Sequence, residues 1–266
     1  MAKLGEKKRR MADESRSAGK AWCELQKAKK KEYNDKAMEG RPKREMRKKE
    51  LPFHTRCSLG GFTSLVQFVN GKEHLKERVK RIGFGNLLKV QLNRLPRDLI
   101  VSMLRAYDPA THQFRIRGKT KEIEASDVHK LLGIPHSGEE VKVDVEDSNR
   151  RYQWLKREYG RKKYTDILKR IKSGTAGDKF EFMFVLYSLG TLLCPTSSGL
   201  ISDRMLRVMF CTMDGFEHYD WATYIMKDLW KEMSDYVKEY REKKKREGSS
   251  NVGGCLYLLL VCHCLH

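Results

Sequence analysis

The chain has 266 residues, of which 39% are apolar and 34% are Asp, Glu, Lys or Arg. This length permits one large domain or two small ones with a sizeable core, and the high charged fraction indicates that part of the chain lies outside that core. The formal net charge of +20 favours polyanionic partners such as DNA, RNA or an acidic membrane surface, but it carries no information about base sequence.

Cysteine usage and the two chain ends indicate an intracellular protein. The seven cysteines are scattered without the spacing of a disulfide framework, and the opening MAKLGEKKRR does not resemble a signal peptide. The apolar run at 255–266 is shorter than the roughly 20 residues that a membrane span requires. We therefore expect a core helix there and no membrane partner.

The segment 1–52 is a basic tail that we expect to be disordered or loosely helical, and nearly half of the net charge falls within its first 50 residues. Short basic clusters of this kind are typical of nuclear import signals and polyanion contacts. The alternative is a solvated arm without a partner. The three clusters comprise Lys7, Lys8, Arg9 and Arg10; Lys29, Lys30 and Lys31; and Lys43, Arg44, Arg47, Lys48 and Lys49.

A helical domain is predicted to begin at Phe53. Apolar residues recur at helical spacing in three stretches, 62–69, 74–82 and 96–107. Pro96 suits the first turn of the third helix, because its missing N–H has no helical partner there. We expect Leu99, Met103 and Ala106 to form the buried face of this helix.

A β-hairpin is predicted next, over QFRIR (113–117) and KEIEA (121–125). Alternation in the first strand points Phe114 and Ile116 toward the core and Arg115 and Arg117 outward. A glycine supplies the turn, and Ile123 of the returning strand faces the same core.

A short helix follows the hairpin. Ser126 is a suitable N-cap because its hydroxyl can accept a hydrogen bond from a free backbone N–H. Val128, Leu131 and Leu132 form the expected apolar stripe, and Gly133 ends the helix.

Helical patterns fill the rest of the chain. They cover 150–159, 163–172, about 178–194, 200–210 and about 218–245. The third of these is apolar nearly all round, which predicts the central buried helix, and Asp178 and Glu181 have capping-box spacing at its start. The last has a predicted stripe of Ile225, Leu229, Met233, Tyr236 and Tyr240. The predicted fold is therefore mainly α: a single helical domain over 53–266 with one small hairpin.

Catalytic and cofactor signatures are missing from the sequence. GFGNLL (83–88) lacks the pattern of a phosphate-binding glycine loop, no Cys or Ser has a nucleophile signature, and His129 is expected to be an exposed helix residue. The C-terminal thiols and imidazoles have the wrong spacing for zinc and suit a buried helix better: Cys255, Cys262, His263, Cys264 and His266. We expect no enzyme, metal, cofactor or small-molecule substrate.

The hairpin offers a nucleic-acid hypothesis. It carries four cations that would form a basic ridge on the face opposite its apolar side chains: Arg115, Arg117, Lys119 and Lys121. The alternative is a small sheet whose outer face is solvated by long cations. No aromatic residue interleaves with them to support base stacking.

Five stretches together resemble the plant mobile domain, often labelled "aminotransferase-like", in the version found upstream of a ubiquitin-like cysteine protease domain in plant transposon-derived proteins. The resemblance spans roughly 57–266 and depends on the order and spacing of the stretches. They are GFGNLLKVQLNRLPRDLIVSMLRAYDP (83–109), FRIRGKTKEIEASDVHKLLGIPHSG (114–138), DKFEFMFVLYSLGTLLCPTSSG (178–199), DWATYIMKDLW (220–230) and NVGGCLYLLLVCHCLH (251–266).

The resemblance implies a helical, non-enzymatic domain of transposon origin, located in the nucleus and acting through association with DNA or chromatin proteins. The label implies no aminotransferase activity, since the chain shows no cofactor-lysine motif. Two alternatives stay open. One is the non-catalytic N-terminal part of a ubiquitin-like-specific cysteine protease. The other is a nonfunctional remnant, because the family helix at 255–266 suggests truncation at the C-terminus.

Overall fold

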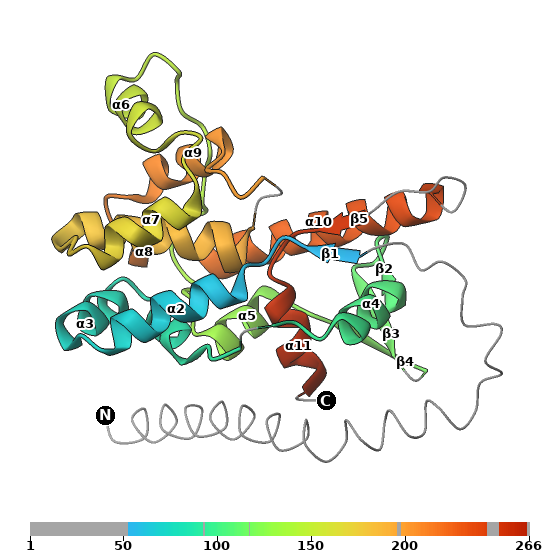
Figure 1. The fold of residues 1–266 in the computed structure, drawn as a ribbon. Helices are drawn as coiled ribbons and strands as arrows, with labels where there is room; N and C mark the ends of the chain where they lie inside the picture. The colour runs from blue at the N-terminus through green and yellow to red at the C-terminus, as the bar shows by residue number, and fades with distance from the viewer. Residues whose placement is uncertain (1–52, 93, 117, 196–197, 244–249, 265–266) are drawn as a thin grey trace. The chain divides into compact units, whose positions relative to one another are not determined.

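The computed structural model describes residues 53–92, 94–116, 118–195, 198–243 and 250–264. They fold mainly as helices (Figure 1), which confirms the predicted fold class. The basic tail, with all three of its clusters, lies outside the described residues. None of the described helices is long and apolar enough to cross a membrane.

Helices dominate the chain order. The α-helices are α2 (Leu59–Asn70), α3 (Glu73–Arg81), α4 (Arg97–Ala106), α5 (Ala125–Leu132), α6 (Arg150–Tyr159), α7 (Tyr164–Lys172), α8 (Gly177–Ser188), α9 (Asp203–Thr212), α10 (Trp221–Lys243) and α11 (Leu256–Cys264). Shorter helical segments are η1 (Gly85–Lys89), the π-helix η2 (Leu189–Leu193) and η3 (Phe216–His218). The strands are β1 (Phe53–Thr55), β2 (Tyr107–Asp108), β3 (Gln113–Ile116), β4 (Lys119–Glu122) and β5 (Ser250–Val252).

Helix α8 is the centre of the core, as predicted. Every residue from Phe180 to Ser188 is buried, and burial continues through η2. Helices α7, α9 and α3 pack against α8. Aromatic side chains of α8 also contact one another and the end of α6. The rings of Phe180 and Phe184 lie 6.0 Å apart, and the ring of Phe182 lies 5.1 Å from that of Tyr159.

The predicted capping box at the start of α8 is wrong. The N-cap is Ala176, without a side-chain cap, and Glu181 is buried instead of reaching back to the helix end. Its Oε1 lies 2.9 Å from Arg78 Nη1 and 2.5 Å from Arg81 Nη2, both on α3. A buried carboxylate needs partners of opposite charge, and a distant helix supplies them here.

Two small sheets accompany the helices. The predicted hairpin is present as β3 and β4, and β2 extends it to a three-stranded antiparallel sheet that the sequence did not indicate. Phe114 and Ile123 are buried, as expected. A second sheet pairs β1 with β5 in parallel, and beside it Arg56 Nη1 lies 2.7 Å from Glu232 Oε2.

The buried face of α4 differs from the predicted one. Ile100, Met103 and Leu104 are buried, whereas Leu99 and Ala106 are partly exposed. The buried residues also have helical spacing, so the apolar face is rotated from the predicted one while Met103 belongs to both. Pro96 stands at the N-cap and the helix begins one residue later.

Helix α5 begins earlier than predicted. Its N-cap is Glu124, not Ser126, and the carboxylate of Asp127 accepts a 3.0 Å hydrogen bond from the Glu124 N–H in a capping box. Val128 is buried as expected. Gly133 ends the helix at φ 63°, a left-handed conformation that favours glycine.

The C-terminal helices agree with their predicted patterns where side chains are described. Ile225, Leu229, Met233 and Tyr236 of α10 are buried, and Tyr240 lies outside the described side chains. In α11 the run Leu258–Leu260 is buried. The first turns of α11 are therefore core, as the apolar sequence indicated.

Candidate nucleic-acid interface

The strand register divides the hairpin cations between two faces. In the antiparallel pair, Arg115 stands opposite Thr120, whereas Lys119 and Lys121 stand opposite the two apolar residues of β3. Directly opposed residues share a face of the sheet. The predicted ridge on the face opposite the apolar side chains is therefore wrong for Lys119 and Lys121, and Arg117 lies outside the described residues.

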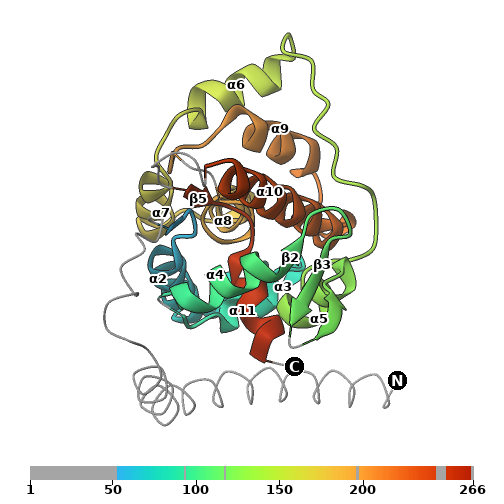
Figure 2. The same cartoon turned by 90° about the vertical axis from the view of Figure 1, so that its right-hand side faces the viewer.

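Helix α6 is the more strongly organised basic element. It lies at one end of the fold with α9 beneath it (Figures 1 and 2). Asn149 caps its first turn, because the side-chain oxygen accepts from the N–H groups of Arg151 and Tyr152 at 3.0 and 3.1 Å. Tyr152, Leu155 and Tyr159 are buried and form the face toward the core.

The sides of α6 are held by ion pairs with the α9 region. Asp203 Oδ1 lies 2.9 Å from Lys156 Nζ and accepts a 2.9 Å hydrogen bond from the Tyr152 hydroxyl. The hydrogen bond from Lys156, helped by those from Arg207 and Tyr152, outweighs burial and lowers the pKa of Asp203 to about 2. Arg151 contacts both carboxylate oxygens of Asp214, at 2.9 and 3.1 Å.

The remaining face of α6 points away from this packing. At about 100° per residue, Arg150, Trp154 and Arg157 fall within a narrow arc opposite the buried residues. Trp154 is 52% exposed. Its indole stands at 80° to the ring of Tyr159, with 6.4 Å between centroids. Of the described residues, only Trp154 and Val143 are large apolar side chains left exposed.

The cations around Trp154 lack carboxylate partners. Within the part of the chain that the structure describes, no acidic group pairs with Arg150, Arg157 or Arg161, and all three are exposed. Arg161 follows α6 at φ 56°, a strained conformation for a residue with a Cβ, and its N–H donates to the Ile201 carbonyl at 3.1 Å. We call Arg150, Trp154 and Arg157 the α6 outer face.

Sequence reasoning predicted the helix at 150–159 but missed this face. The signal that would have found it is the spacing of Arg150, Trp154 and Arg157 at i, i+4 and i+7. An aromatic residue between two cations on one helical stripe differs from the alternation of opposite charges that is typical of a solvent-exposed helix face.

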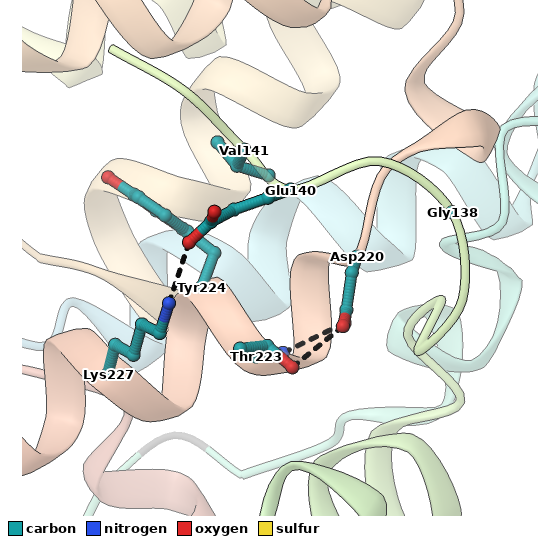
Figure 3. A pocket seen from close by; sticks show the side chains of 7 residues that line it. All are labelled: Gly138, Glu140, Val141, Asp220, Thr223, Tyr224 and Lys227. Atoms are coloured by element: carbon teal, nitrogen blue, oxygen red, sulfur yellow. Dashed lines mark hydrogen bonds and ion pairs between the residues drawn. The ribbon is translucent and has the colours of Figure 1, made fainter.

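A pocket of about 270 Å³ lies between the 138–141 segment and the start of α10 (Figure 3). It is lined by Gly138, Glu140, Val141, Asp220, Thr223, Tyr224 and Lys227. Asp220 accepts 3.0 and 2.7 Å hydrogen bonds from the backbone N–H and the hydroxyl of Thr223, and Lys227 pairs with Glu140 at 2.7 Å. These polar groups are committed to each other rather than converging on an open position.

The thiols and imidazoles do not form a reactive group in the described structure. Burial raises the pKa of Cys57 to about 12 and that of Cys194 well above its usual value, so both thiols stay protonated. His129 is exposed, and its Nδ1 lies 2.7 Å from the Ile134 carbonyl oxygen. No group of three His, Cys, Asp or Glu among the described residues is arranged to hold a metal ion.

The comparisons with known proteins place the chain in a family without assigning an activity. No curated protein and no solved structure matches it. One family model, described as a domain of unknown function (DUF8566), matches residues 55–260. That range contains α2 through β5, including α6 and the hairpin. The chain therefore belongs to the DUF8566 family.

Proposed function

We propose that this chain is a non-enzymatic nuclear protein of transposon origin that binds nucleic acid. The transposon origin and the nuclear location rest on the resemblance to the plant mobile domain and on the basic tail. The binding rests on one observation, which is the unpaired cations of the α6 outer face. Chromatin proteins with acidic surfaces are the competing partners.

The contrast between the two sides of α6 supports a polyanion as the partner. On the packed side, Arg151 and Lys156 are matched by the carboxylates of Asp214 and Asp203. On the outer face, Arg150 and Arg157 have no such match among the described residues. Unpaired cations that stay exposed keep their full attraction for phosphate, and their contact with it releases counterions.

The hairpin would add a second contact. Arg115 and Lys119 are exposed, and no carboxylate pairs with either within the described ranges. Because Arg115 and Lys119 lie on different faces of the hairpin, we assign them to positioning on the phosphate backbone rather than to base recognition.

The non-enzymatic part of the proposal is supported by the state of the polar groups. Burial raises the pKa of Asp220, but hydrogen bonds from Thr223 and the interaction with His136 together outweigh it and lower the pKa, which keeps this carboxylate ionised in a capping role at the pocket. Burial raises the pKa of Tyr224 on the pocket wall. Neither group is tuned toward the near-neutral pKa that general acid–base chemistry favours.

Fluorescence anisotropy with the full chain tests the binding. A labelled DNA and a labelled RNA are titrated across a salt series, and affinity is expected to fall linearly with rising salt on logarithmic axes. Unlabelled polyglutamate serves as an acidic-protein competitor. If polyglutamate displaces the labelled nucleic acid as effectively as unlabelled nucleic acid does, a chromatin protein is favoured as the partner. No binding at low salt would contradict the proposal.

A further inference from the structure

We infer that the α6 outer face is a stacking site for an unpaired base of single-stranded nucleic acid. The inference rests on the proposed function and narrows it from nucleic acid in general to single strands. It is carried by the exposed indole of Trp154 and by the two unpaired arginines that flank it on the same helical face.

The indole is placed as a platform rather than as core. Trp221 is fully buried, whereas Trp154 is 52% exposed on the side of α6 opposite the packed residues. Tyr159 supports the indole edge-to-face at 80°, and Tyr159 is itself buried. A half-exposed aromatic ring that is braced by a buried one offers a stacking surface for a base.

The flanking charges match a single strand. Arg150 lies about one helical turn before Trp154 and Arg157 about one turn after it, and the two arginines span about 10 Å along the helix axis. A strand that lays one base on the indole runs its phosphates to either side of that base. Guanidinium groups at both sides contact such phosphates.

A duplex does not fit the indole equally well. The bases of a duplex are stacked on each other, so their faces are closed to a side chain on a helix surface. A duplex would contact the arginines through its phosphates while the indole contributed little. We therefore expect Trp154 to matter for single strands and to have almost no effect on duplexes.

A second copy of the chain is a poorer occupant. A two-fold dimer through this face would bring the unpaired arginines of both copies together, and like charges in an interface without carboxylates oppose association. The occupant must carry negative charge and an aromatic face at once, which a nucleotide does.

The test compares matched variants of the full chain. The substitution Trp154→Ala is expected to weaken binding of a labelled 12-nucleotide single strand about 5- to 150-fold, the range of one lost base–aromatic stack. Trp154→Phe keeps an aromatic face and is expected to retain most of the affinity. Val143→Ala truncates the other exposed apolar residue and serves as the control that changes nothing.

Charge is tested separately from stacking. The double variant R150Q/R157Q is expected to lower the salt slope for single strands by about 1.4. The variant R115Q/K119Q/K121Q removes cations from the hairpin instead and is expected to leave the effect of Trp154→Ala unchanged. Thermal unfolding monitored by circular dichroism checks that each variant stays folded.

The outcomes separate the inference from the proposed function. If the wild-type chain binds both strands and duplexes but Trp154→Ala binds single strands as tightly as Val143→Ala does, the stacking site is wrong and the nucleic-acid proposal stands. An equal loss for single strands and duplexes also overturns stacking. If the wild-type chain binds neither, both fail.

Discussion

The Tyr152 hydroxyl donates a 2.9 Å hydrogen bond to the Asp203 carboxylate, and this contact joins α6 to the start of α9. Lys156 pairs with the same carboxylate oxygen. The side chain of Arg207 contacts the other oxygen of this carboxylate, with its Nε 2.9 Å from Oδ2. Asp203 is therefore one of the contacts that hold α6 against α9, and three neighbouring side chains share its carboxylate.

Replacing Asp203 should reveal its contribution to the free energy of unfolding as a function of pH. The folded pKa of Asp203 is lowered to about 2, below the value of about 3.9 expected in the unfolded chain. Its stabilising contribution is therefore fully present above pH 4 and is lost as pH falls through 2. We expect Asp203→Asn to lower the free energy of unfolding at pH 6 and the difference from wild type to shrink toward pH 2.

Urea unfolding of both proteins at several pH values measures this difference. Asp214→Asn is the matched control, because it also removes a carboxylate that pairs with α6, but from a more exposed position. Exposed ion pairs contribute little to stability. A deficit for Asp203→Asn that stayed constant from pH 6 to pH 2 would contradict the assignment of the shift to this carboxylate.

The ion pair between α3 and α8 should behave asymmetrically on mutation. The Glu181 side chain is 9% exposed, while those of Arg78 and Arg81 are 32% and 60% exposed. Removing both arginines leaves a buried carboxylate without a partner of opposite charge, which costs roughly 3–5 kcal/mol when no water can reach it. Removing the carboxylate leaves two cations that water can solvate.

We therefore expect R78A/R81A to lower the free energy of unfolding by about 2–4 kcal/mol and Glu181→Leu to lower it by less than about 1 kcal/mol. Chemical denaturation of the two variants and the wild type measures these differences in the free energy of unfolding. Equal losses would mean that the attraction itself, rather than the desolvated carboxylate, sets the energy of this cluster.

Local signals in the sequence were sufficient where neighbouring residues determine the structure. The hairpin and α5 were predicted because alternation, a glycine turn and Gly133 all act within a few residues. The central position of α8 followed from its apolar surface on every side. These features need no knowledge of the rest of the chain.

Long-range partners could not be predicted in the same way. The pairing of β1 with β5 joins residues almost 200 positions apart, and neither three-residue strand has a pattern of its own. Glu181 has the spacing of a cap, but burial against α3 makes it an ion-pair partner instead. Spacing alone does not tell which distant helix will cover a carboxylate.

The candidate site shows the same division. Strand alternation correctly predicted that Arg115 and Phe114 lie on opposite faces. The faces of Lys119 and Lys121 depend on the cross-strand register, which is set by the length of the turn. The helix at 150–159 was predicted, yet the exposure of Trp154 depends on which side of α6 meets α9. An aromatic residue at helical spacing is more often core than platform, so only the packing distinguishes the two.

A pair of glycines provides a packing prediction. A Cβ at Gly190 in η2 would lie 1.9 Å from the buried ring of Tyr164, whereas a Cβ at Gly60 in α2 meets nothing within 4 Å. We expect Gly190→Ala to lower the free energy of unfolding by about 1–3 kcal/mol through overpacking. Gly60→Ala should raise it by up to about 1 kcal/mol, because alanine restricts the unfolded chain. Opposite signs in urea unfolding support this packing, and a neutral Gly190→Ala contradicts it.

The basic tail provides the last prediction, which concerns localisation. The clusters at 7–10, 27–31 and 41–49 are expected to drive nuclear accumulation of the full chain, because short dense runs of Lys and Arg are what import receptors bind. The measurement is the nuclear-to-cytoplasmic fluorescence ratio of the chain fused to a reporter too large to diffuse through nuclear pores. Glutamine at all three clusters should bring the ratio down to that of the reporter alone. The hairpin variant R115Q/K119Q/K121Q, which leaves the tail intact, should keep the wild-type ratio. Accumulation that survives loss of the clusters but not loss of the hairpin cations would assign nuclear retention to the folded part and leave the tail as a solvated arm.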